Sequence, residues 1–203
     1  MTGRPFLLGV VPGATPGKWI GIWNKRMPQV ALELVPISVS EQRRRLDSGD
    51  VHAALVRQPI NRDGLHLIPL YDEIAVVVMS TESHLSVAEE LSSEDLSGEI
   101  VFTPSDDVLG IEVAGTVAAA VDGSLDTADA IATAASGAGI VIVPMSLARL
   151  HHRRDATFRP LIGGPVSPVG LAWPLHPPDD EVAAHIQTFI GIVRGRSARS
   201  SRT

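Results

Sequence analysis

The sequence of 203 residues contains no cysteine, which excludes disulfide bonds, thiolate metal sites and a cysteine nucleophile. Aromatic residues make up only 4% of the chain, so a core must be built mostly from Val, Leu, Ile and Ala. No apolar run approaches the roughly 20 residues that a membrane-spanning helix needs. The first residues do not show the charged leader, apolar stretch and cleavage site of a signal peptide. We therefore expect a soluble cytoplasmic protein with no membrane partner.

Hydrophobic residues make up 44% of the chain and charged residues 20%, which favours a packed core over disorder. A chain of this length forms one domain or two small lobes. The formal net charge is −6, yet the last ten residues hold four arginines and no acid. The body that remains is strongly acidic and is a poor surface for nucleic acid. We expect no direct DNA binding, except weakly through the tail residues Arg194, Arg196, Arg199 and Arg202; the alternative for this tail is a loose, solvated end.

The most informative segment is 125–147, LDTADAIATAASGAGIVIVPMSL. Asp126 or Thr127 can cap a helix start, because a short side-chain oxygen accepts an orphan backbone N–H there. Small apolar residues then recur at helical spacing until a Gly-Ala-Gly sequence, which ends the helix because glycine adopts the left-handed conformation easily. The apolar run 140–143 is typical of a strand that is covered on both faces. A proline ends this strand, and a further helix follows.

Strands and helices alternate along the rest of the chain. The expected strands are 6–11, 30–35, 51–56, 65–70, 74–79, 99–102, 121–125, 140–143, 158–161 and 168–173. Besides the helix of segment 125–147, the expected helices are 17–27, 40–46, 87–96, 111–120, 147–151 and 180–193. Strands that alternate with helices imply parallel pairing. A βαβαβ pattern occurs over residues 6–56 and again over 99–143.

Two similar halves joined by two strands predict an α/β fold. We expect two βαβ-containing lobes around a cleft, joined by two crossing strands, which is the two-lobed architecture of type 2 periplasmic binding proteins. Lobe I would comprise residues 1–79 and 167–203, and lobe II residues 80–166.

Several short motifs occur in a characteristic order. Residues 27–34 (MPQVALEL) contain the pattern P-x-V-x-L-x-L, and residues 45–52 (RLDSGDVH) follow L-x-x-G-x-x-D with His52 in place of the final acid. Residues 64–78 then contain Gly64-Leu65, Pro69-Leu70 and the apolar run 74–78. The helix–glycine–strand–proline unit described above comes after them. In this order the sequence resembles the effector-binding domain of LysR-type transcriptional regulators, and the resemblance covers most of residues 6–192.

The resemblance implies a ligand-sensing regulatory domain. The helix-turn-helix part of such regulators would precede Phe6, so we expect this chain to lack a DNA-binding domain. The implied partners are a small-molecule effector and a second copy of the chain, because the first helix of such domains commonly packs against a partner subunit. A full-length regulator is a further candidate partner.

In such a fold, ligands bind beyond the carboxyl ends of the strands, where helix N-termini favour anions. The candidate ligand-binding residues are Thr15, Ser38, Ser40, Arg57, Gln58, Thr103, Ser105 and Thr127. Arg57 and Gln58 could reach a carboxylate, and the resemblance assigns ligand hydroxyls to the turns that carry Thr15, Ser38 and Ser40. Plain N-capping of helices is the alternative role for every serine and threonine in this set.

Cofactor and metal chemistry find little support in the sequence. Residues 13–18 (GATPGK) lack the spacing of a nucleotide-binding phosphate loop. The adjacent His151 and His152 would point in different directions on a helix, which makes joint chelation awkward. We therefore expect no cofactor and no metal.

The alternative function is a small-metabolite enzyme, such as a lyase or dehydratase, on the same two-lobed fold. It would need acid and base groups that converge on a cleft, and the sequence offers only Asp106, Asp107 and Glu41. A transport-type solute-binding protein is a third hypothesis, which the lack of an export signal argues against. We therefore predict a domain, not an enzyme, that senses a small anionic metabolite and relays binding through dimerisation to transcription regulation.

Overall fold

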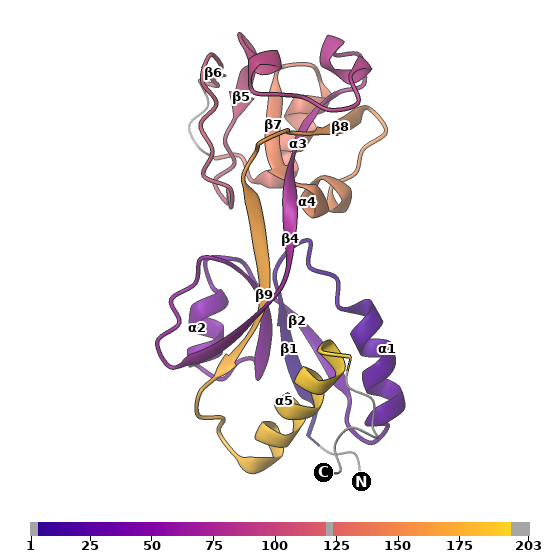
Figure 1. Ribbon diagram of the computed structural model, residues 1–203, viewed down its shortest axis with the longest axis vertical. Coiled ribbons are helices and arrows are strands. Elements are labelled where there is room, and N and C mark those ends of the chain that lie inside the picture. The colour runs from indigo at the N-terminus through magenta and orange to yellow at the C-terminus, as the bar shows by residue number, and fades with distance from the viewer. Residues whose placement is uncertain (1–3, 121–123, 196–203) are drawn as a thin grey trace. The chain divides into compact units, whose positions relative to one another are not determined.

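The computed structural model describes residues 4–120 and 124–195. These residues form two compact units: the first lies within Met1–Leu70 and Val169–Thr203, and the second within Tyr71–Pro168 (Figure 1). Strands β4 (Leu65–Ser80) and β9 (Val166–Pro174) contribute residues to both units. Residues 75–80 of β4 pair with two strands of the second unit.

The first unit is built on a parallel sheet with one antiparallel addition. Strand β1 (Phe6–Val10) pairs in parallel with β2 (Leu32–Pro36) on one side and with β3 (Ala53–Arg57) on the other. Strand β9 continues the sheet antiparallel to β3. Helices α1 (Gly17–Arg26) and α2 (Gln42–Asp47) connect the parallel strands, and α5 (Asp180–Val193) follows β9 and packs against α1.

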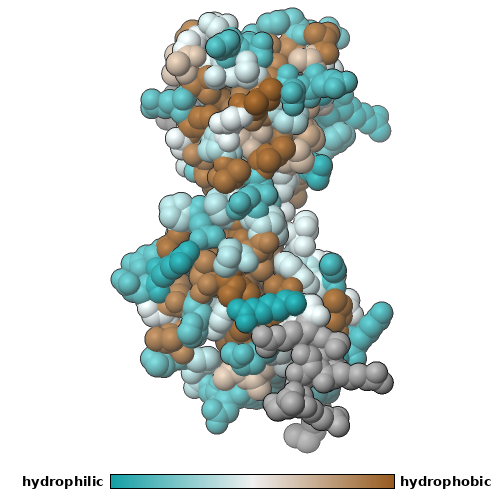
Figure 2. Space-filling model, viewed as in Figure 1, coloured by the Kyte–Doolittle hydropathy of each residue, from teal (hydrophilic) through white to brown (hydrophobic). Residues whose placement is uncertain are grey.

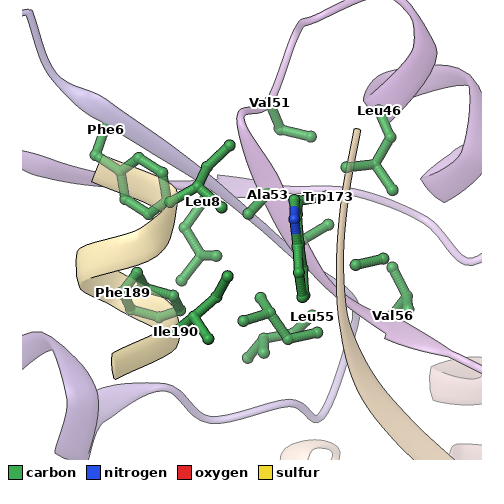
Figure 3. Close-up of a cluster of buried hydrophobic side chains, with 14 of the residues drawn as sticks. Phe6, Leu8, Leu46, Val51, Ala53, Leu55, Val56, Trp173, Phe189 and Ile190 are labelled. Carbon is green, nitrogen blue, oxygen red and sulfur yellow. The ribbon is translucent and has the colours of Figure 1, made fainter. Parts of the chain in front are cut away.

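The core of the first unit gathers most of the chain's few aromatic rings. The Phe6 and Trp23 rings stack with centroids 5.0 Å apart, and the Phe189 ring of α5 lies 5.6 Å from Phe6. Figure 3 shows Phe6 and Phe189 beside the aliphatic side chains of β1 and β3, among them Leu8 and Leu55. Each large ring buries far more surface than an aliphatic side chain. These few rings therefore contribute much of the packing of α1 and α5 against the sheet.

The second unit has a mixed sheet in the order β8-β4-β7-β5-β6. The strands at one end of this order are parallel: β5 (Ile100–Phe102) pairs with β6 (Val117–Ala118) and with β7 (Ile140–Pro144). Strand β4 is antiparallel to both β7 and β8 (Ala156–Pro160). Helices α3 (Thr127–Ala135) and α4 (Met145–Leu150) flank β7 in sequence.

The central strand β7 confirms the expected doubly covered run, because every one of its residues is buried. Val141 and Val143 pack in one hydrophobic cluster with Ala130 and Ala134 of α3. Ile140 and Ile142 point to the other face and pack in a second cluster, which includes Leu85, Leu91, Leu96 and Leu161. Alternate side chains of a strand point to opposite faces, so an uninterrupted apolar run is what a strand between two packed layers requires.

Two helices expected from the sequence are wrong. In place of a helix over 87–96, the structure has two 3₁₀ turns, η1 (His84–Val87) and η2 (Glu94–Leu96). The chain between them is bent and not helical, and Leu91 bridges to Leu161: the Leu91 N–H donates to the Pro160 carbonyl oxygen at 2.9 Å. A tertiary pairing therefore overrides the local preference of this acidic segment.

The helix expected over 111–120 is also wrong, because part of this segment forms the short edge strand β6. A turn at Gly115, with a φ of 84°, precedes this strand, and Val117 N–H then donates to the Glu99 carbonyl oxygen at 2.8 Å. The strand expected over 121–125 falls partly outside the described residues, and Ser124 and Leu125 are not in a strand. The two strands expected over 65–70 and 74–79 are one continuous strand, β4.

Candidate functional site

The carboxyl edge of the first sheet carries most of the predicted ligand-binding residues. Because β1, β2 and β3 are parallel neighbours, the turns that follow them lie along the same edge. Thr15 lies exposed in the turn between β1 and α1, and Ser38 and Ser40 lie between β2 and α2. Arg57 ends β3, and Gln58 follows it. The parallel topology thus brings five predicted residues from three segments to one edge.

Arg57 is held by a side chain that the sequence analysis did not single out. The Gln42 side-chain amide donates to the Arg57 carbonyl oxygen at 2.9 Å, and its oxygen accepts the Arg57 backbone N–H at 3.0 Å. Gln42 is buried, although three arginines follow it directly in the sequence QRRRLD of α2. The one sequence feature that could have identified Gln42 is its neutral amide beside three arginines. The two hydrogen bonds fix the backbone at the end of β3.

The guanidinium group of Arg57 is also held at this edge. Its Nη2 atom donates to the carbonyl oxygen of Pro12 at 3.1 Å, in the turn that leads to Thr15. Arg57 is only 1% exposed, which is rare for a cationic side chain. The end of β3 is therefore tied to the β1–α1 turn, and the edge carries a buried positive charge.

Ser38 forms a reciprocal cap with Glu41. The Ser38 hydroxyl accepts the Glu41 backbone N–H at 3.2 Å and donates to the Glu41 carboxylate at 2.9 Å, and that carboxylate also accepts the Ser38 backbone N–H at 3.4 Å. In the turn before α2, these bonds have the reciprocal pattern of a capping box, which the S-x-x-E spacing of residues 38–41 could have indicated. The hydrogen bond from Ser38, then that from Arg44, lowers the pKa of Glu41. Ser40 is exposed, with its hydroxyl oxygen 3.0 Å from that of Ser38.

In the second unit, the predicted residues lie at the carboxyl end of β5 and at the start of α3. Thr103 and Ser105 are exposed in the loop after β5, and the Ser105 N–H donates to the Leu125 carbonyl oxygen at 2.8 Å. Thr127 is buried, and both its backbone N–H and its hydroxyl donate to the same oxygen of Asp106, each at 2.8 Å. The loop after β5 is therefore pinned to the helix start.

The amino end of α3 is already occupied by two carboxylates of the chain. Asp106 accepts from Thr127, and Asp126 accepts the Asp129 N–H at 2.9 Å, which makes Asp126 the cap of the helix. Negative groups near a helix N-terminus are favoured by the helix dipole and by its unsatisfied N–H groups. Asp106 thus takes the position at this helix that an external anion would take.

The three acidic residues considered for an enzyme all accept backbone N–H groups. Asp107 accepts from Leu109 and Gly110 at 2.9 Å each, while Asp106 and Glu41 act as described above. Within residues 4–120 and 124–195, no three His, Asp or Glu side chains are grouped so that they could hold a metal ion. None of the helices in these same ranges is long and apolar enough to cross a membrane.

The second unit also has a surface pocket of about 660 Å³. It lies at the amino ends of β5 and β7, opposite to Thr103 and Ser105 along these strands, and it contains none of the predicted residues. Its lining includes the carboxylates of Glu82, Glu99 and Asp155, which makes it unsuited to an anion. The carboxyl edges of the sheets are better suited to an anion than this pocket.

Comparison with known proteins identifies the class. The family described as LysR substrate binding domain matches residues 8–198, so this chain belongs to that family. Among curated relatives, the Hca operon transcriptional activator HcaR of Escherichia coli (strain K12) is 25% identical over 209 residues, which cover 96% of this chain and 69% of HcaR. The HTH-type transcriptional regulator AlsR of Bacillus subtilis (strain 168) is 25% identical over 146 residues, 68% of this chain and 48% of AlsR.

Solved structures show the same fold. The oxidised form of OxyR superimposes with a TM-score of 0.75 at 19% identity, covering 97% of this chain and 96% of the OxyR chain. The BenM effector-binding domain with its effector benzoate gives 0.71 at 18% identity, again over 97% and 96%. These matches confirm the α/β, periplasmic-binding-protein-like fold and the LysR resemblance expected from the sequence.

Proposed function

We propose that this effector-binding domain senses a small anionic metabolite at the carboxyl edge of its first sheet and relays binding to transcription regulation. Family membership supports a sensing role, and both curated relatives are described as transcriptional regulators. The anionic class is supported by BenM, whose structure is described with the effector benzoate, a carboxylate. The domain would act by binding, without turnover, in the cytoplasm where the DNA lies.

The observation that carries the proposal is Arg57, a guanidinium 1% exposed at an edge that also bears exposed hydroxyls. The positive charge of a guanidinium attracts an anion more strongly where water is excluded. The Gln42 clamp holds its backbone in place, which lowers the entropy cost of orienting it. Thr15, Ser40 and Gln58 would add neutral hydrogen bonds that select among anions.

The remaining predicted residues fall into two groups in this proposal. Thr103 and Ser105 of the second unit are exposed at the carboxyl end of β5, with hydroxyls that could donate to a ligand at that edge. Ser38 and Thr127 have hydroxyls that already serve the capping box and Asp106, so we propose that they position neighbouring groups. Of the arginine tail, Arg194 is exposed after α5, whereas Arg196, Arg199 and Arg202 lie outside the described residues.

The proposed partner is a second copy of the chain, with exchange into a full-length regulator as the route to DNA. In the sheet order, β2 lies at an outer end and pairs with β1, and Leu34 on it is 45% exposed. An edge strand with an exposed apolar residue favours pairing with another chain. Figure 2 shows hydrophobic residues among hydrophilic ones on the surface in view. The helical face of Trp23 is not part of this surface, because Trp23 is fully buried in the core.

The test is thermal unfolding of the purified chain against a panel of small carboxylates, phosphates and amino acids. A ligand at about 100 times its Kd stabilises the folded state by about 2.7 kcal/mol. For a chain of this size that raises the Tm by about 5–10 °C. A panel in which no carboxylate or phosphate raises the Tm would contradict the proposal.

Two variants locate the site. In Thr15→Trp the indole would occupy the carboxyl edge, so ligand stabilisation should disappear while the Tm without ligand stays within about 2 °C, because Thr15 is exposed. The matched control is Ser48→Trp, an exposed position beyond α2, on the side where β3 begins. If Thr15→Trp keeps the ligand shift, the site is elsewhere.

A further inference from the structure

His52 closes the amino end of the β1–β3 pairing in the first unit. Its backbone N–H donates to the Leu7 carbonyl oxygen at 2.9 Å, and its Nδ1 atom accepts the Leu7 backbone N–H at 3.1 Å. The side chain thus supplies the acceptor for Leu7 at the point where β3 has not yet begun. His52 is only 4% exposed, so water has little access to replace it.

This geometry fixes the protonation state of the imidazole. Leu7 N–H is a donor, so Nδ1 must carry a lone pair, and the ring is neutral with its proton on Nε2. Nε2 is buried and has no hydrogen-bond partner among the described residues. A second proton could only be added at Nδ1, which would remove the acceptor of the Leu7 N–H and place a cation in the core.

The surroundings of His52 do not favour a cation. The Phe6 ring lies 5.8 Å from the imidazole, and the buried His185 of α5 lies 6.3 Å from the same Phe6 ring. The charged groups that face this region are Arg4, before β1, and Asp179, the cap of α5, which form an ion pair at 3.0 Å. Burial lowers the pKa of His52 most, Arg4 and His185 lower it further, and Asp179 opposes them.

We propose that His52 is an acid-sensitive latch: one proton at Nδ1 breaks the bond to Leu7 and loosens the start of β1 together with the aromatic cluster on which α1 and α5 pack. The cluster is the physical link, because Phe6 next to Leu7 stacks on Trp23 of α1 and contacts Phe189 of α5. The latch lies at the amino edge of the sheet, so it is independent of the ligand site proposed at the carboxyl edge. Acidification would therefore loosen the packing of α1 and α5 on the first sheet.

The sign of the effect follows from proton binding. An unfolded histidine titrates near pH 6.5. Because the folded pKa is lower, the folded chain binds fewer protons than the unfolded chain below that pH. Stability from the latch is therefore fully present above about pH 6.5 and declines as the pH falls toward the folded pKa. Within that window the folding equilibrium constant falls by up to about tenfold per pH unit through this group alone.

The experiment compares urea unfolding of the wild type, His52→Asn and His185→Gln at pH 7.5, 6.5 and 5.5. An asparagine carbonyl oxygen can accept the Leu7 N–H at every pH, so His52→Asn keeps the bond and removes the titration. As the pH falls, we expect the folding constant of the wild type to decrease more steeply than that of His52→Asn. The difference should be up to about tenfold per pH unit. His185→Gln should keep most of the wild-type slope. Equal slopes in wild type and His52→Asn would overturn the proposal, as would loss of the slope in His185→Gln alone.

Two measurements on the wild type keep the test decisive if His52→Asn does not fold. Hydrogen exchange of the Leu7 amide, corrected for intrinsic rates, should lose protection between pH 7.5 and 5.5. Nitrogen chemical shifts of His52 should show an unprotonated Nδ1 at pH 7.5 and a titration midpoint below the value near pH 6.5 of an unperturbed histidine. A protonated Nδ1 at pH 7.5, or unchanged Leu7 protection at pH 5.5, would refute the latch.

Discussion

The Asp106 carboxylate at the start of α3 allows a prediction on both stability and binding. In Asp106→Ala, two hydrogen bonds of 2.8 Å are lost, and the Thr127 N–H and hydroxyl are left without their acceptor at a buried residue. Hydrogen bonds to charged groups contribute about 1.5–3 kcal/mol each, but Asp106 itself is exposed and its charge is screened. We therefore expect a loss of about 2 kcal/mol in the free energy of unfolding. This corresponds to a Tm lower by about 4–8 °C.

The assay is urea unfolding of Asp106→Ala beside Asp106→Asn, which keeps one acceptor oxygen and should lose about half as much. Asp107→Asn is the control, because Asp107 accepts from the backbone N–H groups of Leu109 and Gly110 in its own turn. It should cost less than about 1 kcal/mol. If Asp106→Ala and Asp107→Asn are equally stable, Asp106 does not hold α3 and the loop together.

The Asp106→Ala variant should also gain an anion site. Without Asp106, the N-terminal N–H groups of α3 lose the carboxylate that faces them, and the helix dipole favours a replacement anion. Phosphate at 50 mM, a concentration chosen for about millimolar affinity, should then raise the Tm of Asp106→Ala more than that of wild type. An equal phosphate effect on both chains would refute the idea that Asp106 occupies an anion position.

Two further substitutions test local packing, one in each unit. Gly139→Ala would place a Cβ atom 2.4 Å from the Ile100 carbonyl oxygen at a φ of 155°, so it should destabilise by about 3 kcal/mol, whereas Gly137→Ala has open space and should cost about 1 kcal/mol in the same urea assay. Gln42→Leu removes both hydrogen bonds to the Arg57 backbone and should cost about 2–4 kcal/mol, and it should also weaken any ligand shift of the Tm; a variant of wild-type stability would contradict the clamp.

The parts of the fold that the sequence predicts well are those with a strong local pattern. The buried strand β7 and the capped helix α5 appear within a residue of their expected bounds, because a doubly buried strand needs an unbroken apolar run and a helix start needs an acceptor such as Asp179. The helix prediction for residues 87–96 was wrong because the backbone at Leu91 pairs with Leu161, about seventy residues later in the chain. No local property of an acidic, helix-favouring segment encodes such a pairing.

The candidate site shows the same limit. Topology alone places Thr15, Ser38 and Arg57 at one edge, since parallel strands end together, and this much follows from the predicted βαβ order. The hydrogen-bond partners could not be predicted in the same way. Gln42 reaches Arg57 across fifteen residues, and Asp106 reaches Thr127 across twenty-one. Contacts of this kind depend on how side chains meet after the sheet has formed.

These partners make the two units chemically different although both repeat a similar strand order. At the carboxyl edge of the first sheet the chain places a buried cation, Arg57, and leaves the Thr15 hydroxyl exposed. At the corresponding edge of the second sheet it places its own carboxylate, Asp106, on the helix start. The carboxyl edge of the first sheet should therefore favour an anion more than the carboxyl edge of the second sheet does. Arg57→Met, which removes the charge but keeps much of the apolar stem, should then abolish anion binding more completely than Thr103→Val, as measured by the ligand shift of the Tm.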